Sequence, residues 1–177
     1  MSEFLPEFHK LNINESDGLL MTVLIGISFR HRDVYFELHR VKNKYKLYWC
    51  FETFLDEIYR HYVDNGGNEK IPFEEFLNSR EIQEAEQKRT VQDSCYIETE
   101  DEEFLSNFLK NGLMDLDRHV PMGLDGHHYI ITIKGDPDRE YYAWCVIPKE
   151  WCELKTLVEI LRKYAGLSER YSVSGMK

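Results

Sequence analysis

No apolar run in this sequence approaches the roughly 20 residues that a membrane-spanning helix requires, so we expect no membrane span. The start of the chain also lacks the basic end and apolar core of a secretory signal, because Glu3 and Glu7 stand there. We therefore expect a cytoplasmic protein. The 4 cysteines contain no C-x-x-C pair, which disfavours a zinc site. We interpret all of them as reduced and most as buried: Cys50, Cys95, Cys145 and Cys152.

The local signatures of catalysis are absent too. The sequence has no glycine-rich phosphate loop, no dinucleotide-binding fingerprint and no nucleophile elbow. No local pattern supports a nucleophilic triad, although the members of a triad can lie far apart in a sequence. His31 and His39 lie among arginines, whose charge disfavours a metal ion, and we expect both at the surface. We predict a protein that is not an enzyme and has no cofactor, catalytic residue or metal site.

Acidic residues are in excess, 32 against 22 basic residues, which gives this chain of 177 residues a net charge of −10. The excess lies in the middle of the chain. Residues 52–103 hold 16 acids and 5 bases, whereas residues 104–177 hold 10 of each. Such an excess repels nucleic acid and anionic membranes and attracts basic partners. A helical face kept acidic for solubility shows the same excess, so both interpretations stay open.

The first part of the chain predicts three strands joined by short turns. Residues 19–29 form a β-branched apolar run, which is typical of a strand buried on both faces. Residues 34–41 partly alternate between polar and apolar, and residues 45–51 follow after a turn at 41–44. Strands in this order, with short turns between them, indicate an antiparallel meander.

The middle of the chain predicts mostly helices. Apolar residues at helical spacing predict one helix over 53–63 and another that begins at Pro72. Residues 80–90 are polar on nearly all sides and form an exposed helix or a segment that becomes ordered on binding. A short strand is predicted at 94–98. Thr99 and Glu102 form a predicted capping box for a helix that ends at Gly112.

The last third predicts strands over 128–134 and 140–147, a turn at 135–138, and a helix over 153–164 followed by Gly166. This hairpin-then-helix order repeats the order of residues 34–63, and each hairpin ends near Trp-Cys. A decayed ββα duplication, with halves 18–66 and 99–167, and a coincidence both explain the repeat. In either case we predict one α+β domain over residues 1–177. Its antiparallel sheet is built from meander and hairpin units, with helices packed on one face.

The acidic residues around the third predicted helix form the candidate contact surface. An acidic helical surface attracts a basic partner and raises its association rate. The same acids favour the positive end of the helix dipole, which is a structural reason for the pattern. The candidate partner-binding residues are Glu98, Glu100, Asp101, Glu102 and Glu103, with Glu81, Glu84 and Glu86 as a second patch. Exposed tyrosine or tryptophan side chains would add binding energy.

Two other classes of function stay open. Three carboxylates and three imidazoles within residues 115–128 could bind a metal or perform acid–base chemistry, although a tight turn explains Leu124-Asp125-Gly126 equally well. This enzyme alternative uses Asp115, Asp117, His119, Asp125 and His127. A nucleic-acid binder would use the basic, aromatic meander of Arg30, Arg32, Tyr35, Arg40, Lys42, Lys44, Tyr45 and Lys46. The net negative charge disfavours nucleic acid, and we expect these bases to pair with the acidic helices.

Residues 124–161 resemble a pattern found in small bacterial proteins. Leu124-Asp125-Gly126 opens a hairpin, Trp144 closes it, and Pro148, Trp151 and Leu154 lead into a helix. Some of those proteins are regarded as immunity proteins, which neutralise a toxin of the same strain. The resemblance implies the hairpin–helix architecture and carries no functional residue across. With the acidic surface, it predicts a non-enzymatic immunity protein that blocks a basic, nuclease-like toxin domain by steric and electrostatic complementarity.

Overall fold

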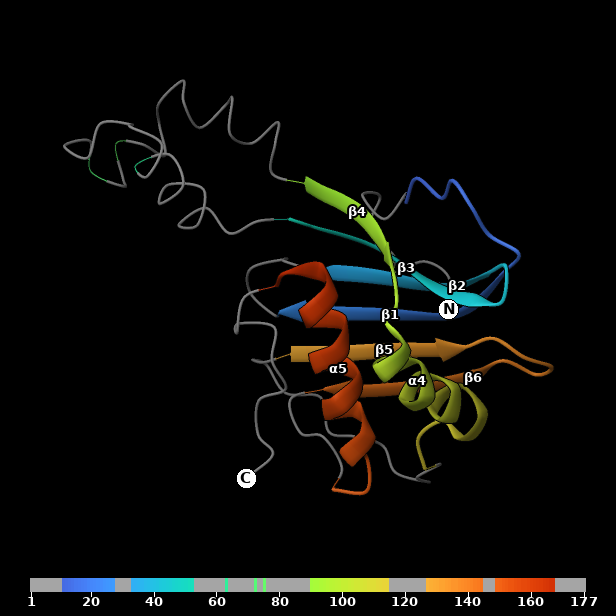
Figure 1. The fold of residues 1–177 in the computed structure, drawn as a ribbon. Helices are drawn as coiled ribbons and strands as arrows, with labels where there is room; N and C mark the ends of the chain where they lie inside the picture. The colour runs from blue at the N-terminus through green and yellow to red at the C-terminus, as the bar shows by residue number, and fades with distance from the viewer. Residues whose placement is uncertain are drawn as a thin grey trace.

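The computed structural model describes residues 11–27, 33–52, 63, 72, 75, 90–114, 127–144 and 149–167. Within these residues, the strands form one antiparallel sheet in the order β4-β3-β2-β1-β5-β6, and two helices pack against it (Figure 1). This confirms the predicted α+β class. The strands are β1 (Gly18–Ile27), β2 (Val34–Val41), β3 (Lys44–Glu52), β4 (Thr90–Tyr96), β5 (His127–Ile133) and β6 (Arg139–Trp144), and the helices are α4 (Thr99–Asn111) and α5 (Cys152–Ala165).

β1 lies at the centre of the sheet, between β2 and β5. Val23 of β1 is opposite Phe36 on β2 and Ile131 on β5, and all three belong to the core on the helix side. The next residue, Leu24, is buried in a smaller apolar cluster on the other face. A strand whose side chains alternate between two buried faces must be apolar throughout, and the predicted two-sided burial is confirmed.

A two-residue turn joins β2 to β3. Lys42 and Asn43 both have positive φ, 46° and 65°, which is the backbone of a hairpin turn whose twist matches that of its strands. The backbone N–H of Lys42 donates a hydrogen bond to Asp17 Oδ2 at 2.6 Å. The turn is therefore fixed by its own conformation and by the residues that precede β1.

The main core lies between the sheet and the two helices, which cover the same face (Figure 1). From α5, Leu154, Leu157 and Leu161 are each 0% exposed. From α4, Leu105 and Phe108 are buried. Burying one such side chain contributes about 1.5–3 kcal/mol to stability, so these apolar stripes determine how the helices sit on the sheet.

The start of α4 differs from the prediction and its end agrees with it. Glu98 is the N-cap and its side chain makes no capping hydrogen bond, so the predicted capping box at 99–102 is wrong. The helix begins one residue earlier than the box requires, because the backbone N–H of Glu102, which the box would bond to Thr99, donates to the Glu98 carbonyl at 3.2 Å. At Gly112, φ is 68° and an added Cβ would lie 2.1 Å from the Tyr141 hydroxyl. The helix therefore ends at the glycine, as predicted.

Side chains from other elements bind carbonyl groups at and beyond the C-terminal end of α4. The Arg139 guanidinium of β6 donates to the carbonyls of Leu109 and Lys110. The Trp151 indole N–H donates to the Met114 carbonyl at 2.7 Å. Carbonyls at a helix end have no partner within the helix, so these contacts join α4 to β6 and to the start of α5.

Residues 11–17, here called the N-terminal segment, lie against the sheet face that the helices leave open. Asn14 Oδ1 accepts hydrogen bonds from Lys46 Nζ at 3.1 Å and from the Tyr48 hydroxyl at 3.0 Å. Ser16 Oγ lies 2.6 Å from His39 Nδ1. His39 is 4% exposed, so its predicted surface position is wrong. The reason is this segment, which packs over a strand that would otherwise be open to solvent.

The structure also bears on the predictions for β4, for the cysteines and for the helices in the middle of the chain. β4 begins at Thr90, earlier than the short strand predicted at 94–98. The described cysteines form no disulfide, but Cys50 is buried, Cys95 half-buried and Cys152 exposed, so they are not mostly buried. Apart from single positions, the predicted helices over 53–63 and from Pro72 lie outside the described residues, and the duplication stays a prediction. No helix among the described residues is long and apolar enough to cross a membrane.

Candidate functional site

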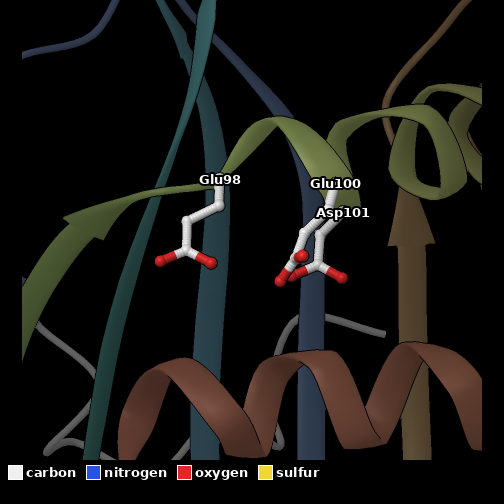
Figure 2. A group of neighbouring side chains, drawn as sticks. All are labelled: Glu98, Glu100 and Asp101. Atoms are coloured by element: carbon white, nitrogen blue, oxygen red, sulfur yellow. The ribbon is translucent and has the colours of Figure 1, made fainter.

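The acids predicted as a contact surface lie where β4 passes into α4. Figure 2 shows the carboxylates of Glu98, Glu100 and Asp101 pointing toward α5. Their oxygens lie within 4.8 Å of one another. Three negative charges this close repel one another unless a cation lies among them. The structure therefore brings together three of the predicted residues and raises the question of what balances their charge.

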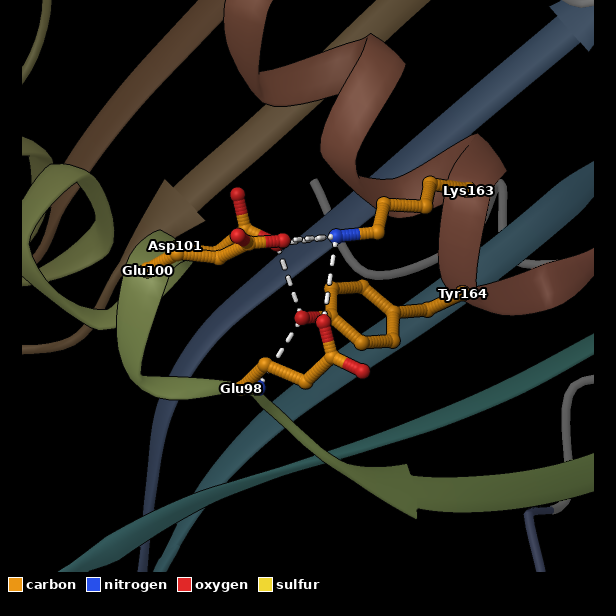
Figure 3. A network of polar contacts seen from close by, with 5 residues as sticks. All are labelled: Glu98, Glu100, Asp101, Lys163 and Tyr164. Atoms are coloured by element: carbon orange, nitrogen blue, oxygen red, sulfur yellow. Dashed lines mark hydrogen bonds and ion pairs between the residues drawn. The ribbon is translucent and has the colours of Figure 1, made fainter.

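Lys163 of α5 provides that cation (Figure 3). Its ammonium lies 2.7 Å from Glu100 Oε1, 3.1 Å from Asp101 Oδ2 and 3.3 Å from Glu98 Oε2. Hydrogen bonds to Glu100 and then to Asp101 raise the pKa of Lys163, which keeps the ammonium charged. The position that a metal ion would take among these carboxylates is thus occupied by a lysine.

Tyr164, the next residue of α5, supports the same arrangement from its hydroxyl group. The hydroxyl donates to Asp101 Oδ2 at 2.7 Å and accepts the backbone N–H of Glu98 at 2.9 Å (Figure 3). Burial raises the pKa of Tyr164 to about 12, and the hydrogen bond to Asp101 contributes in the same direction. The phenol therefore keeps its proton and fixes the first turn of α4 against α5.

Lys163 and Tyr164 are the residues of this site that sequence reasoning missed. The hydrogen bonds of Lys163 to Asp101 and of Tyr164 to Asp101 span 62 and 63 residues of sequence. A lysine in the last turn of a helix is ordinary, because it favours the negative end of the helix dipole. No local signal could have connected these two residues to the acids.

The structure describes two of the remaining predicted acids, Glu102 and Glu103. Glu102 is half-buried and Glu103 exposed. Within the part of the chain that the structure describes, neither has an ion-pair partner. Lys163 therefore offsets one of five negative charges, and the start of α4 stays acidic. The second patch, Glu81, Glu84 and Glu86, lies outside the described residues.

The aromatic side chains that could anchor a partner are fewer than the sequence suggests. Trp49 and Trp151 are each 5% exposed and belong to the core. Among the described residues, the exposed large hydrophobic side chains are Ile13, Tyr96, Met114 and Tyr142. Any aromatic anchor described here is therefore a tyrosine, and Tyr96 lies closest in sequence to the acidic residues of α4.

Of the residues of the enzyme alternative, the described part of the chain includes only His127. Asp115, Asp117, His119 and Asp125 lie outside the described residues. His127 is half-buried, and its ring stacks on Tyr129 with ring centroids 6.3 Å apart. The enzyme alternative that uses these residues stays a prediction.

Two of the basic residues of the meander, Lys46 and Arg40, lie on opposite faces of the sheet, and the nucleic-acid alternative stays a prediction. Lys46 is 7% exposed and faces the N-terminal segment, where among the described residues it pairs with Glu15 at 3.7 Å. Arg40, next to His39 on β2, points to the other face and lies over the Tyr45 ring. Side chains that alternate along a strand point to opposite faces, so the bases are divided. Arg30 and Arg32 lie outside the described residues.

Comparison of the chain with protein-family models, curated proteins and solved structures gives no significant match.

Proposed function

We propose that this protein is a binding module that holds a basic protein partner against the acidic start of α4. The observation that carries the proposal is the charge left at this surface. Glu98, Glu100 and Asp101 share one lysine, and Glu102 and Glu103 have no ion-pair partner among the described residues. An excess of one charge on an exposed helix steers a partner of the opposite charge.

The packing of α4 supports this proposal because it makes the surface rigid. Leu105 and Phe108 anchor the helix in the core, while Tyr164 fixes its first turn. A preformed surface loses little conformational freedom on binding, so more of the contact energy contributes to affinity. The side chains of Glu98 and Glu100 are 65% and 70% exposed, which leaves them accessible to a partner.

The more specific version of the proposal is an immunity protein whose partner is a nuclease-like toxin domain. Its support is the resemblance of residues 124–161 and the chemistry of nucleases, which need a cationic cleft for a phosphate backbone. An acidic helix can occupy such a cleft and exclude the substrate. The binding module is the broader claim and does not depend on the toxin.

The test uses the tagged full-length protein as bait in a lysate of its own host. Wild-type protein is compared with Glu102→Lys/Glu103→Lys and with Glu140→Lys, which reverses an exposed charge on β6. We expect the wild type and the β6 variant to capture one stoichiometric basic protein. At low salt this partner should associate with the α4 variant about tenfold more slowly than with the wild type. The association rate of the purified partner is measured at low and moderate salt.

Two results would contradict the proposal. One is a partner that associates equally fast with the α4 variant and the wild type at every salt concentration. The other is the absence of any stoichiometric partner. The toxin version is tested separately, by expressing the captured protein alone and together with this chain: toxicity that co-expression relieves supports it, and a harmless partner contradicts it.

A further inference from the structure

A second polar set lies on the sheet face opposite the helices. Ser16 of the N-terminal segment and Glu37 and His39 of β2 are hydrogen-bonded in a row. Ser16 Oγ lies 2.6 Å from His39 Nδ1, and His39 Nε2 lies 2.8 Å from Glu37 Oε2. The other carboxylate oxygen of Glu37 accepts the Tyr35 hydroxyl at 2.9 Å. The set therefore contains a hydroxyl, an imidazole and a carboxylate in contact, which is the composition of a nucleophile–base–acid site.

The hydrogen bonds determine which nitrogen of His39 carries the proton. An ionised carboxylate can only accept a hydrogen bond, so an imidazole that carries one proton places it on Nε2, 2.8 Å from Glu37 Oε2. Nδ1 then presents a lone pair to Ser16 Oγ, and the serine hydroxyl donates to it. This is the tautomer in which an imidazole can take a proton from a serine.

The imidazole and the carboxylate are held inside the fold, whereas Ser16 is an exposed residue. The side chains of His39 and Glu37 are 6% and 16% exposed, and Ser16 is an exposed residue. The Tyr48 ring packs edge-on against His39, with ring centroids 5.3 Å apart. Burial raises the pKa of Tyr35 and the Glu37 carboxylate raises it further, so the phenol keeps the proton that it donates. Packing and hydrogen bonds thus fix the orientation of the imidazole behind an accessible serine.

We propose that Ser16 is a nucleophile toward esters, with His39 as its general base and Glu37 as the residue that positions His39. Ser16 Oγ bonds to the ester carbonyl carbon while its proton moves to His39 Nδ1. The bond from that carbon to the leaving oxygen breaks, and His39 gives the proton to the departing alkoxide. Water then attacks the acyl-serine, its proton passes to His39, and Ser16 leaves with that proton as a hydroxyl. The products are an alcohol and a carboxylic acid.

The surroundings of Ser16 favour a small, uncharged ester. Ser16 lies between Glu15 and Asp17, whose carboxylates disfavour an anionic substrate. The backbone N–H of Glu15 donates to the Tyr48 hydroxyl at 3.1 Å, and that of Asp17 donates to the Arg40 carbonyl at 2.7 Å. These amides are therefore not free to stabilise the negative oxygen of the reaction, and one such donor contributes about 10²–10³-fold in rate. We expect slow acylation that is measured best as a single covalent turnover.

The test labels the full-length protein with a small, uncharged fluorophosphonate, a reagent that forms a stable adduct with activated serines. Peptide mass spectrometry identifies the labelled residue, and intact mass gives the rate. We expect one adduct, on Ser16, that is lost in Ser16→Ala and unchanged in Ser106→Ala, which removes an exposed serine of α4. Wild-type protein without an adduct on Ser16 would overturn the proposal. The assay needs no partner protein, so its outcome is independent of the proposed binding function.

Glu37→Gln distinguishes an activated serine from one that is only exposed. The new amide has almost the same shape, but it can donate to His39 Nε2 and so move the imidazole proton to Nδ1, which removes the base. We expect the labelling rate to fall by about tenfold or more. Tyr35→Phe is the second variant if Glu37→Gln does not fold, and its rate should fall by about two- to threefold, since one hydrogen bond to Glu37 is lost. Equal labelling rates in the folded variant and the wild type would overturn the proposal.

Discussion

The two polar sets of this protein use similar residues in opposite environments. Around Lys163 the carboxylates of Glu98 and Glu100 are 65% and 70% exposed. Around His39 the imidazole and the Glu37 carboxylate are 6% and 16% exposed. Water and salt weaken the interactions of the first set strongly and those of the second much less. The acidic residues around Lys163 are therefore accessible to a charged partner, whereas the hydrogen bonds around His39 hold particular side chains in position.

The largest effect that distinguishes the two sets is expected from His39→Ala. The substitution leaves the half-buried Glu37 carboxylate with Tyr35 and without its imidazole partner. We expect the free energy of unfolding to fall by about 2–3 kcal/mol, because a carboxylate inside the fold loses a hydrogen-bond donor. Urea denaturation measures it. A loss under about 1 kcal/mol would mean that the hydrogen bonds of His39 contribute no more to stability than the exposed ion pairs of Lys163.

The response to pH should differ between the faces as well. Burial lowers the pKa of His128, on the sheet face opposite the helices, below 6.5; Asp33 opposes this shift and His127 adds to it. The unfolded chain then binds a proton more readily than the folded protein, so stability is lost as pH falls below about 6.5. We expect His128→Gln to reduce the stability lost between about pH 7.5 and about pH 5.5. Lys163, whose pKa is raised, keeps its ion pairs over this range.

An unchanged pH dependence in His128→Gln would assign the acid sensitivity to other groups. Urea denaturation of both proteins at the two pH values gives the comparison. One titrating group changes stability by at most about 1.4 kcal/mol per pH unit, and a larger change would require more than this histidine.

A smaller effect is expected from Tyr164→Phe, which removes only the hydroxyl between Glu98 and Asp101. The variant leaves the backbone N–H of Glu98 without this acceptor. We expect a loss of about 1 kcal/mol in the free energy of unfolding, the usual contribution of one hydrogen bond. Hydrogen exchange at the first turn of α4 should become faster, while exchange in β1 should not change. Equal protection of α4 in both proteins would show that the core alone fixes the helix.

The smallest effect is expected from Lys163→Ala. Its ion pairs are exposed, so we expect a loss of less than about 1 kcal/mol, and a smaller loss at high salt. Lys155→Ala, an exposed lysine on the same helix, serves as the matched control. Association with a basic partner should become faster in the Lys163 variant, because Glu98 and the four acids in the first turns of α4 then have no ion-pair partner among the described residues. Slower association would contradict the assignment of this surface.

The strands and helix ends that depend on residues close together in the sequence could be predicted from it. The β1 strand and the helix ends at Gly112 and Gly166 follow from apolar runs and from glycines with positive φ, 68° and 62°. The Glu37 and His39 side chains share one strand face at a spacing of two residues, which the sequence shows. The sequence does not show that the N-terminal segment packs over these two side chains. Ser16 lies 23 residues from His39, and their contact forms only in the folded sheet.

The predicted contact acids illustrate the same limit. Their position at a helix start could be inferred from the charge pattern, but the capping box does not form, because the Glu102 N–H donates to the Glu98 carbonyl. Tyr164 binds the backbone of Glu98 and Lys163 binds its side chain, and both come from the other end of the chain. Packing between distant elements decides which of several locally plausible hydrogen bonds forms.

The central position of β1 has a consequence for the order in which the protein is assembled. One neighbour, β2, follows directly along the chain, but the other, β5, is reached only at residues 127–133. During synthesis the meander can therefore form early, while the second edge of β1 keeps its backbone donors and acceptors open to solvent. Pairing over such a long separation is slow, because closing a long loop costs entropy before any contact forms. We therefore expect the β5–β6 hairpin to pair with β1 late in folding, and until then β1 is the edge at which unfinished chains can pair with one another.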